Sequence, residues 1–459
     1  MTHVHFIGIG GSGLSAIARL LLESGYTVTG SDKNLSPLAR QLSESGVQVK
    51  IGHNPQNVEG ADLVIRSSAV PDDNPEVLAA QAAGIPVYKR ADFLGKLMSG
   101  RTGIAVAGTH GKTTTTSMIA WMLSYLGLDP SYIIGGVSKN LQVNAHAGSG
   151  RPFVIEADEY DRMFLGLQPK YIVVTNVEYD HPDCYPTLTD YLAAFSEFVS
   201  GLEPEGVLLV CQDDPGAISL MKYIPKDCTA YTYGTQSGNY QASEIKPNNH
   251  GGFDFQVNWL TTKSTAKGLG SVSLQVPGKH NVQNATAALA VAHQLGQPLE
   301  QAALALGSFL GTGRRFDIIG EIKGITIIDD YAHHPTEIRA TLAAARARYP
   351  DRRLWAVWQP HTYSRTQSLL DDFCKAFTDA DQVLVTEIYA AREKKQDFSA
   401  IQVVQKMHAS NVMFVPSLGG AIERLLEQLR PGDVLLVLSA GDADQISAGV
   451  MSRLSEREE

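Results

Sequence analysis

The chain has 459 residues, of which 44% are hydrophobic and 19% charged, and its formal net charge is −10. This length suggests about three domains of roughly 150 residues each, and the hydrophobic fraction indicates large cores rather than a disordered chain. The acidic balance argues against nucleic acid or a membrane surface as a partner. No apolar run approaches the roughly 20 residues of a membrane span, no basic leader precedes the first strand, and the cysteines show no C-x-x-C pairing. We therefore expect a cytoplasmic protein.

The first hundred residues alternate short apolar strands with helices, a pattern typical of a parallel, doubly wound sheet. Strands are expected at 4–9, 27–31 and 63–66, and a helix at 12–23. The sequence Gly8-Ile-Gly10-Gly11-Ser12-Gly13 fits G-x-G-x-x-G between a strand and a helix, and Asp32 ends the next strand. This fingerprint predicts a diphosphate at the start of the helix. NAD is one such ligand and a UDP-sugar is another.

The stretch at 105–116, AVAGTHGKTTTT, carries the strongest functional signal, and a helix is expected at 113–126. A Gly-Lys-Thr sequence at a strand-to-helix turn places backbone N–H groups and an ammonium where phosphate oxygens bind. The hydroxyl of Thr113 can hold Mg²⁺. The match to the general P-loop is incomplete, because its first glycine would fall at Val106 and Gly108 is present instead. We interpret the turn as a nucleoside triphosphate site.

Two acidic clusters follow strands expected at 153–155 and 171–175 in this second unit. They are Glu156-Ala-Asp-Glu-Tyr-Asp161 and Asn176-Val-Glu-Tyr-Asp-His181. Carboxyl ends of parallel strands are where open α/β sheets bind ligands, and carboxylate oxygens suit Mg²⁺. The two clusters together therefore predict a metal site beside the phosphate turn.

The rest of the second unit changes character. A strand is expected at 207–210, and residues 231–276 are predicted to form an antiparallel annex. A helix expected at 281–295 carries Asn281 and Asn284 on one face. These amides could bind a base or ribose, and helix capping by Asn281 is the alternative explanation.

A third unit is expected to begin near Gly311, where β-α alternation restarts with strands at 325–328, 354–357, 383–386 and 434–438. Arg314 and Arg315 lie at this junction and suit phosphate. The sequences DDYAHHP and QPHTYSRT each follow one of these strands. Their placement predicts a cleft lined by all three units.

As an ordered set, the motifs GIGGSG, AGTHGKTTTT, EADE, TNVEYDH, HNVQN, GTGRRFD, DDYAHHPTE and QPHTYSRT resemble the Mur ligases over nearly the whole chain. The resemblance implies an α/β fold of three domains. These are a Rossmann-like UDP-sugar-binding domain at 1–100, a P-loop-type ATPase domain at 101–310 and a Rossmann-like domain at 311–459. It also implies Mg²⁺ and ATP-driven amide formation in peptidoglycan precursor synthesis. The lactyl carboxylate of UDP-N-acetylmuramate becomes an acyl phosphate, which the amine of L-alanine attacks.

The resemblance also implies roles for individual residues. The catalytic set is Lys112, Glu156, His181 and Arg365. The UDP-sugar set is Gly10, Gly11, Ser12, Gly13, Asp32, Ser67 and Ser68. The ATP set is Gly108, Thr109, His110, Gly111, Lys112, Thr113, Thr114, His280, Asn281, Asn284, Arg315, Asp330 and His333. The amino-acid end is Tyr331, His361 and Arg365, and the metal ligands are Thr113, Glu156 and His181.

Two positions depart from the pattern of the family members that add L-alanine. Tyr160 stands where many of them have Ser, and Thr362 stands where several have Arg. A ligase that adds a recycled tripeptide to the same nucleotide sugar is therefore the second interpretation. From the residues alone, an NAD-dependent dehydrogenase and a nucleotide-switched binding protein are the other classes. The first leaves GKTTTT and the acidic clusters unexplained.

Overall fold

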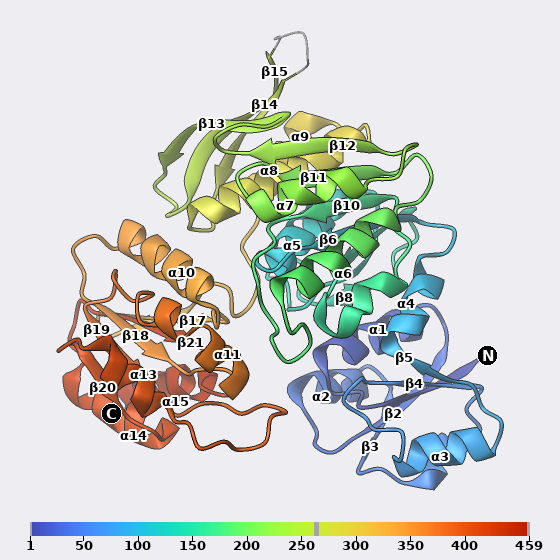
Figure 1. Cartoon of the computed structure of the whole chain (residues 1–459), viewed down its shortest axis with the longest axis horizontal. Helices are drawn as coiled ribbons and strands as arrows, with labels where there is room; N and C mark the ends of the chain where they lie inside the picture. The colour runs from blue at the N-terminus through green and yellow to red at the C-terminus, as the bar shows by residue number, and fades with distance from the viewer. Residues whose placement is uncertain (1, 261–265, 457–459) are drawn as a thin grey trace.

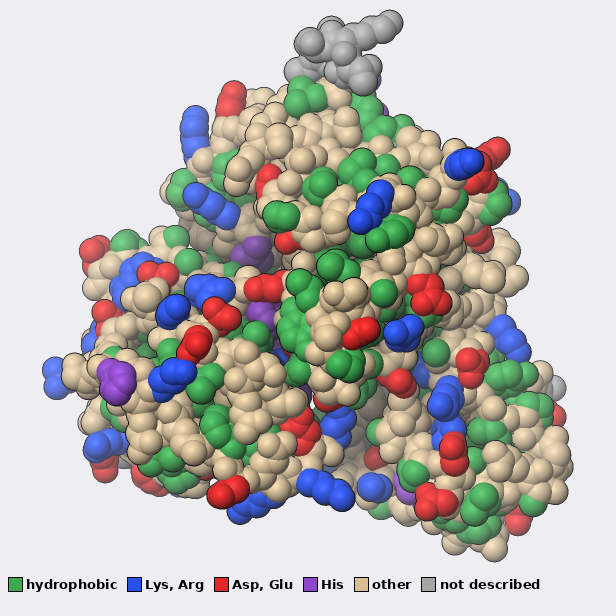
Figure 2. Space-filling model, in the orientation of Figure 1, with side chains coloured by type: hydrophobic (Ala, Val, Ile, Leu, Met, Phe, Trp, Pro, Cys, Tyr) green, Lys and Arg blue, Asp and Glu red, His purple; other side chains and the backbone are tan. Residues whose placement is uncertain are grey.

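The computed structural model describes residues 2–260 and 266–456, and it contains three α/β units, each built on its own sheet (Figure 1). The third unit lies beside the other two, and Figure 2 shows the visible face hollowed between them, with histidine side chains at the seam with the second unit. The predicted architecture of three α/β domains is confirmed. No helix among the described residues is long and apolar enough to cross a membrane.

The first unit is a parallel sheet with the order β3-β2-β1-β4-β5. Its strands are β1 (His3–Ile7), β2 (Thr27–Asp32), β3 (Gln48–Ile51), β4 (Leu63–Arg66) and β5 (Val87–Lys89). Its helices are α1 (Ser12–Glu23), α2 (Pro37–Glu44), η1 (Pro55–Val58), α3 (Pro75–Ala82) and α4 (Arg90–Met98). The predictions for 12–23 and 63–66 are correct. The strand expected at 4–9 ends at Ile7, because Gly8 turns the chain with φ 86°.

The second unit is a sheet of ten strands in the order β15-β14-β13-β12-β11-β10-β6-β9-β7-β8. The strands are β6 (Thr102–Ala107), β7 (Ser131–Ile133), β8 (Ala145–His146), β9 (Pro152–Glu156), β10 (Tyr171–Val174), β11 (Val207–Cys211), β12 (Thr229–Gly234), β13 (Tyr240–Pro247), β14 (Phe253–Leu260) and β15 (Ala266–Leu274). The helices are α5 (Lys112–Tyr125), η2 (Tyr160–Gly166), α6 (Leu188–Ser200), α7 (Pro215–Ser219), η3 (Leu220–Tyr223), α8 (Lys279–Gln294) and α9 (Leu299–Gly307).

The antiparallel annex expected at 231–276 is correct only in part. β12 pairs in parallel with β11, and the antiparallel ladder consists of β13, β14 and β15. The annex therefore continues the central sheet instead of forming a separate one. Residues 261–265, within the same prediction, lie outside the described residues.

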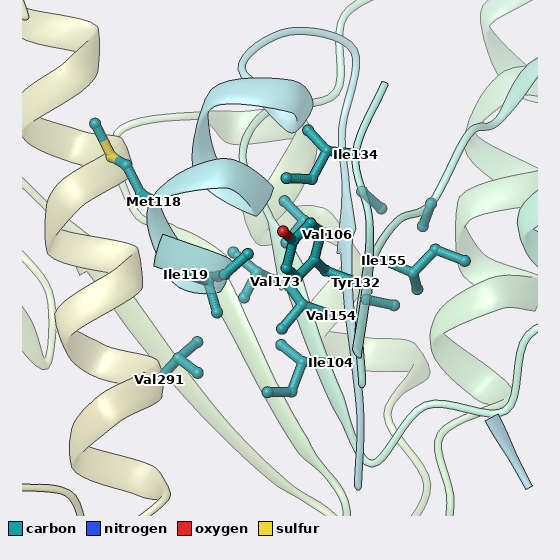
Figure 3. Packing of buried hydrophobic residues seen from close by; sticks show 14 of the residues in the cluster. Ile104, Val106, Met118, Ile119, Tyr132, Ile134, Val154, Ile155, Val173 and Val291 are labelled. Atoms are coloured by element: carbon teal, nitrogen blue, oxygen red, sulfur yellow. The ribbon is translucent and has the colours of Figure 1, made fainter. Parts of the chain in front are cut away.

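The core of the second unit fixes the helix that follows the phosphate turn. Met118 and Ile119 of α5 are fully buried against Ile104 and Val106 of β6, with Val291 of α8 in the same cluster (Figure 3). Burying each such side chain contributes about 1.5–3 kcal/mol. The indole N–H of Trp121 also donates to the carbonyl of Ala305, 2.9 Å away, and ties α5 to α9. The start of α5 therefore rests on a closely packed base.

The third unit has six strands in the order β16-β17-β21-β18-β19-β20, with apolar clusters on both faces. The strands are β16 (Asp317–Ile322), β17 (Ile325–Asp330), β18 (Leu354–Trp358), β19 (Gln382–Val385), β20 (Val412–Phe414) and β21 (Val434–Leu438). The helices are α10 (Pro335–Arg348), α11 (Tyr363–Ser368), α12 (Leu370–Phe373), α13 (Ala400–Met407), α14 (Leu418–Gln428) and α15 (Asp444–Glu456). The four expected strands are present. β16 was not predicted; it forms a hairpin with β17, with which it pairs antiparallel.

Candidate active site

The glycine turn of the first unit lies at the carboxyl end of its sheet. Gly11 is the N-cap of α1, and no side chain caps the helix there. The backbone N–H of Gly10 donates to Asp32, 2.8 Å away, and Ser67 packs within 3.1 Å of where a Cβ on Gly8 would lie. Ser68 is exposed beside them. The turn therefore brings together the predicted UDP-sugar residues, and Asp32 already holds the loop backbone in shape.

The phosphate turn links β6 to α5, and two glycines make its path possible. Gly111 has φ 82°, and Gly108 has φ 134° with Thr175 only 2.1 Å from where a Cβ would lie, so a side chain is excluded there. The backbone N–H of His110 donates to Asn176, 2.8 Å away. The second acidic cluster therefore holds the phosphate turn from the next strand.

Lys112 is the first residue of α5 and folds back over the turn. Its Nζ donates to the carbonyls of Gly108 and Thr109, at 2.6 and 3.0 Å, and lies 2.9 Å from the carboxylate of Glu159. Although burial would lower the pKa of Lys112, Glu159 and Asp158 raise it, so the side chain stays charged. Lys112 therefore presents a fixed ammonium at the turn.

Two of the three predicted metal ligands lie together. The hydroxyl of Thr113 is 2.9 Å from one oxygen of Glu156, and the N–H of Gly135 is 2.7 Å from the other. Burial raises the pKa of Glu156, although Lys112 opposes this. His181 contacts Glu159 instead, with 3.5 Å between Nε2 and the carboxylate. Burial would lower the pKa of His181, but Asp180 and Glu159 raise it.

A cavity of about 260 Å³ opens beside the phosphate turn, between the second and third units. It is lined by eight of the predicted ATP residues: His110, Gly111, Thr114, His280, Asn281, Asn284, Arg315 and Asp330. Burial and Arg315 lower the pKa of His280 to about 4, so its imidazole is neutral near pH 7. The cavity therefore has the apolar and amide lining that a neutral base requires.

The alternative role of Asn281 as a helix cap is wrong. α8 begins two residues earlier, with Gly278 as its N-cap, and Asn281 donates to the carbonyl of Pro277, 2.7 Å away. The amide of Asn284 then donates to the oxygen of Asn281 at 3.0 Å. The pair forms one fixed edge of the cavity.

Asp330 joins the third unit to the cavity. Its two oxygens accept from the backbone N–H groups of Phe316 and Ala332, at 2.6 and 2.7 Å, and burial raises its pKa to about 6. These bonds hold the segment that carries Arg315, which lies over the ring of Tyr331 at 5.0 Å. Asp330 therefore fixes the backbone at the junction between the units.

A row of rings extends from this junction to a buried ion pair. Tyr331, His333 and His361 lie ring to ring at 5.4 and 5.7 Å. Arg365 has a nitrogen 3.0 Å from Nδ1 of His361 and donates to both oxygens of Asp180, at 2.8 and 3.2 Å. Burial lowers the pKa of His333 to about 4 and that of His361 to about 2, so both are neutral. The amino-acid end predicted from the sequence therefore faces the second acidic cluster.

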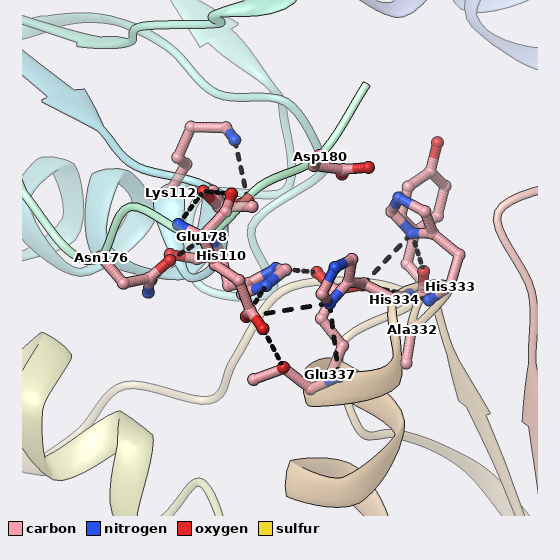
Figure 4. Close-up of polar contacts among 12 residues, drawn as sticks. His110, Lys112, Asn176, Glu178, Asp180, Ala332, His333, His334 and Glu337 are labelled. Carbon is pink, nitrogen blue, oxygen red and sulfur yellow. Dashed lines mark hydrogen bonds and ion pairs between the residues drawn. The ribbon is translucent and has the colours of Figure 1, made fainter. Parts of the chain in front are cut away.

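His110 bridges the two units (Figure 4). Its Nε2 is 3.1 Å from Glu178 and its Nδ1 is 3.2 Å from Glu337 on α10. Although burial alone would lower the pKa of His110, these carboxylates raise it to about 9. Glu178 also accepts from Thr336 at 2.8 Å. Glu159, Glu178, Asp180 and Glu337 were not assigned roles from the sequence, although each lies in a motif quoted above.

The interface should weaken as pH rises through 9. The pKa of His110 in the folded protein lies above its ordinary value of 6.5. The stabilisation of the fold by charged His110 is therefore complete below about pH 6.5 and is lost as the pH rises through about 9. The shift sets an upper limit of about 3 kcal/mol. We expect His110→Asn to lower the midpoint of thermal unfolding most at pH 6–7, with the difference from the parent shrinking by about pH 9.5.

The partly exposed histidine His146 provides the matched control, because its pairs with Glu23 and Asp129 are solvent-accessible. His146→Asn should change the midpoint little at any pH. A difference for His110→Asn that stays constant between pH 6 and 9.5 would contradict a charged His110.

Comparisons with known proteins match nearly the full length of the chain. The Mur ligase family, catalytic domain, matches residues 3–102; the Mur ligase middle domain matches 106–292; and the Mur ligase, glutamate ligase domain, matches 314–441. A UDP-N-acetylmuramate–L-alanine ligase of Geotalea daltonii is 43% identical over 99% of this chain and 98% of its own. The same enzyme of Nitratidesulfovibrio vulgaris is 44% identical over 96% and 97%.

Two solved structures resemble the chain along its whole length. The UDP-N-acetylmuramate–alanine ligase of Thermotoga maritima has a TM-score of 0.84 and 29% identity, with 100% of both chains covered. A murein peptide ligase of Psychrobacter arcticus has a TM-score of 0.74 and 28% identity, with 99% of both chains covered.

Proposed function

This chain belongs to the Mur ligase family, and from that premise we propose how its residues join L-alanine to UDP-N-acetylmuramate at the expense of ATP. The reaction releases ADP and phosphate and supplies a peptidoglycan precursor. The alanine ligases at about 43% identity favour this substrate over the recycled tripeptide. One observation supports the site: the turn that carries Lys112, the cavity and the two acidic clusters lie next to one another.

The chemistry follows from charge. In the first step an oxygen of the lactyl carboxylate bonds to the γ-phosphorus, and the bond to ADP breaks. In the second the amine nitrogen bonds to the acyl carbon, phosphate leaves and the nitrogen loses a proton. The first step brings two anions together, and the second develops negative charge on the carbonyl oxygen and the leaving phosphate, so fixed cations supply most of the stabilisation. Lys112 is one such cation.

The residues present fit Mg²⁺. Thr113 and Glu156 offer hard oxygen donors 2.9 Å apart, and a cation there would offset the burial of the carboxylate. When bound, the ion would neutralise phosphate charge. His181, which contacts Glu159, is the third ligand that we propose. The domain limits that we propose are 1–100, 101–310 and 311–459. The compartment that we propose is the cytoplasm, which holds ATP.

Phosphate release tests the function. The purified protein receives ATP and UDP-N-acetylmuramate with L-alanine, with other single amino acids or with the tripeptide. We expect release to depend on both the nucleotide sugar and L-alanine. Release that requires the tripeptide would overturn the assignment in favour of the second ligase.

Glu156→Gln should raise the Mg²⁺ concentration required for half-maximal activity by about tenfold or more, because a neutral amide is a poorer ligand of the same shape. His181→Ala should act in the same direction but more weakly. Mg²⁺ titrations of activity measure both. Glu300→Gln, at an exposed residue of α9, is the control. Titrations of both variants that overlay the parent would place the metal elsewhere.

A further inference from the structure

Arg90 lies directly on the glycine turn of the first unit. It is the first residue of α4, and its guanidinium covers Gly13 in the first turn of α1. A Cβ on Gly13 would lie 2.2 Å from the guanidinium carbon. Only glycine therefore leaves room for Arg90 in this position.

The guanidinium lacks an acceptor. Nε of Arg90 is buried and has no hydrogen-bond partner among the described residues. The other arginines of the cleft are paired: Arg315 lies 3.7 Å from Glu337, Arg365 lies 2.8 Å from Asp180, and Arg392 donates to Asp183 at 3.0 Å. A buried donor left without an acceptor is unfavourable. Arg90 is therefore placed for an acceptor that comes from outside the chain.

The start of α1 points to what that acceptor is. α1 has twelve residues, and its N-cap Gly11 offers no side-chain acceptor to the first N–H groups. Such a helix start attracts anions through its free N–H groups and its dipole. Asp32 does not fill this role, because its carboxylate accepts from the N–H of Gly10 at the β2 side of the turn. Two independent sets of donors, the Arg90 guanidinium and the first N–H groups of α1, thus lie at the same turn.

We propose that Arg90 binds the diphosphate of the nucleotide sugar, opposite the N–H groups of α1; this rests on the proposed function. A planar guanidinium matches two phosphate oxygens at once, which an ammonium does not reproduce. The residue belongs to no motif that the sequence singled out.

The position of α4 gives this contact a second consequence. α4 leads from the first sheet into the second, and Gly95 approaches Gly166 of η2 so closely that a Cβ would lie 2.4 Å from its carbonyl oxygen. η2 follows directly after Glu159, the partner of Lys112. A diphosphate held by Arg90 therefore fixes the helix that joins the two substrate domains.

Calorimetric titration with uridine, UMP, UDP and UDP-N-acetylmuramate tests the contact. Arg90→Ala should lower the affinity for UDP and for the nucleotide sugar by about 10- to 100-fold, the range for one charged hydrogen-bond partner. The affinities for uridine and for an ATP analogue should stay within about twofold of those of the parent, since neither ligand uses this turn. Arg90→Lys should recover only part of the loss. Lys89→Ala, at the exposed neighbour, is the matched control.

A double-mutant cycle provides a second test. The methyl group of Gly13→Ala displaces the guanidinium. Adding Arg90→Ala to that variant should therefore lower the affinity for UDP little further. Additive losses would show that the two residues act separately. Thermal unfolding monitors the fold, and Arg90→Lys keeps the test valid if Arg90→Ala unfolds.

The outcomes separate this inference from the function on which it rests. A parent that binds UDP and releases phosphate, with an Arg90→Ala variant that binds UDP equally well, overturns only the role of Arg90. A parent that binds neither UDP nor its sugar overturns the proposed function. An Arg90→Ala variant that loses affinity for uridine and for UDP equally would also overturn the diphosphate contact.

Discussion

Lys112→Ala is expected to lower kcat by about a hundred- to a thousandfold, corresponding to the 3–4 kcal/mol that one charge-stabilising group contributes to a transition state. The ammonium lies over the phosphate turn, 2.6 Å from the carbonyl of Gly108. Negative charge develops on the leaving oxygen of ADP as the γ-phosphoryl group is transferred, and the ammonium would neutralise that developing charge. The effect should therefore fall on kcat more than on the KM for ATP. Phosphate release under saturating substrates measures it.

The pairing of Lys112 with Glu159 calls for a control. Glu159 is only 1% exposed in its side chain, so Lys112→Ala leaves a buried carboxylate without its main partner. The double variant Lys112→Ala/Glu159→Gln removes that charge. It should recover stability in thermal unfolding while activity stays low. Near-normal turnover in a folded Lys112→Ala variant would refute the role of the ammonium.

The elements and the motif positions could be predicted from the sequence because their signals are local. The start of α1 at Ser12 and the strand Leu63–Arg66 follow from periodicity, and the turn at Gly111 follows from glycine before a helix. The carboxyl ends of parallel strands then place the motifs at one edge. β16 lacks such a signal, because its edge position leaves half its residues exposed and breaks the alternation.

The pairings across the cleft could not be predicted in this way. Arg365 and Asp180 are separated by 185 positions, and His110 and Glu337 by 227. Which acid faces which base depends on how the third unit docks on the second, and no local pattern encodes that geometry. Arg90 shows the same limit, since only the packing of α4 places it on Gly13.

The family resemblance assigns Arg365 to the amino-acid end, where a guanidinium suits the carboxylate of the incoming amino acid, and the structure adds a second task. The side chain is 4% exposed and forms a two-pronged pair with Asp180 across the cleft. Thr362, with φ 65°, turns the chain just before α11, and its N–H donates to the carbonyl of Tyr389, 2.9 Å away. Arg365 is thus both a candidate ligand for alanine and a link between two units.

Two variants separate these tasks. Arg365→Lys keeps the charge but loses the planar fork, so the KM for L-alanine should rise by about tenfold or more while that for ATP changes little. Asp180→Asn weakens the same ion pair but leaves the guanidinium in place. It should reduce stability, since breaking a buried pair costs about 3–5 kcal/mol, with a smaller rise in the KM for alanine.

Steady-state kinetics with each substrate varied in turn, together with thermal unfolding, decides between the two tasks. If Arg365 contacts the amino acid, the KM for alanine in Arg365→Lys exceeds that in Asp180→Asn, even where the two variants lose similar stability. If Arg365 acts only as the link, both variants raise the KM for alanine and for ATP together, because both loosen the same interface. A parent-like KM for alanine in Arg365→Lys would remove this residue from the amino-acid site and leave His361 and His333, whose neutral rings line the same end, as the groups that contact alanine.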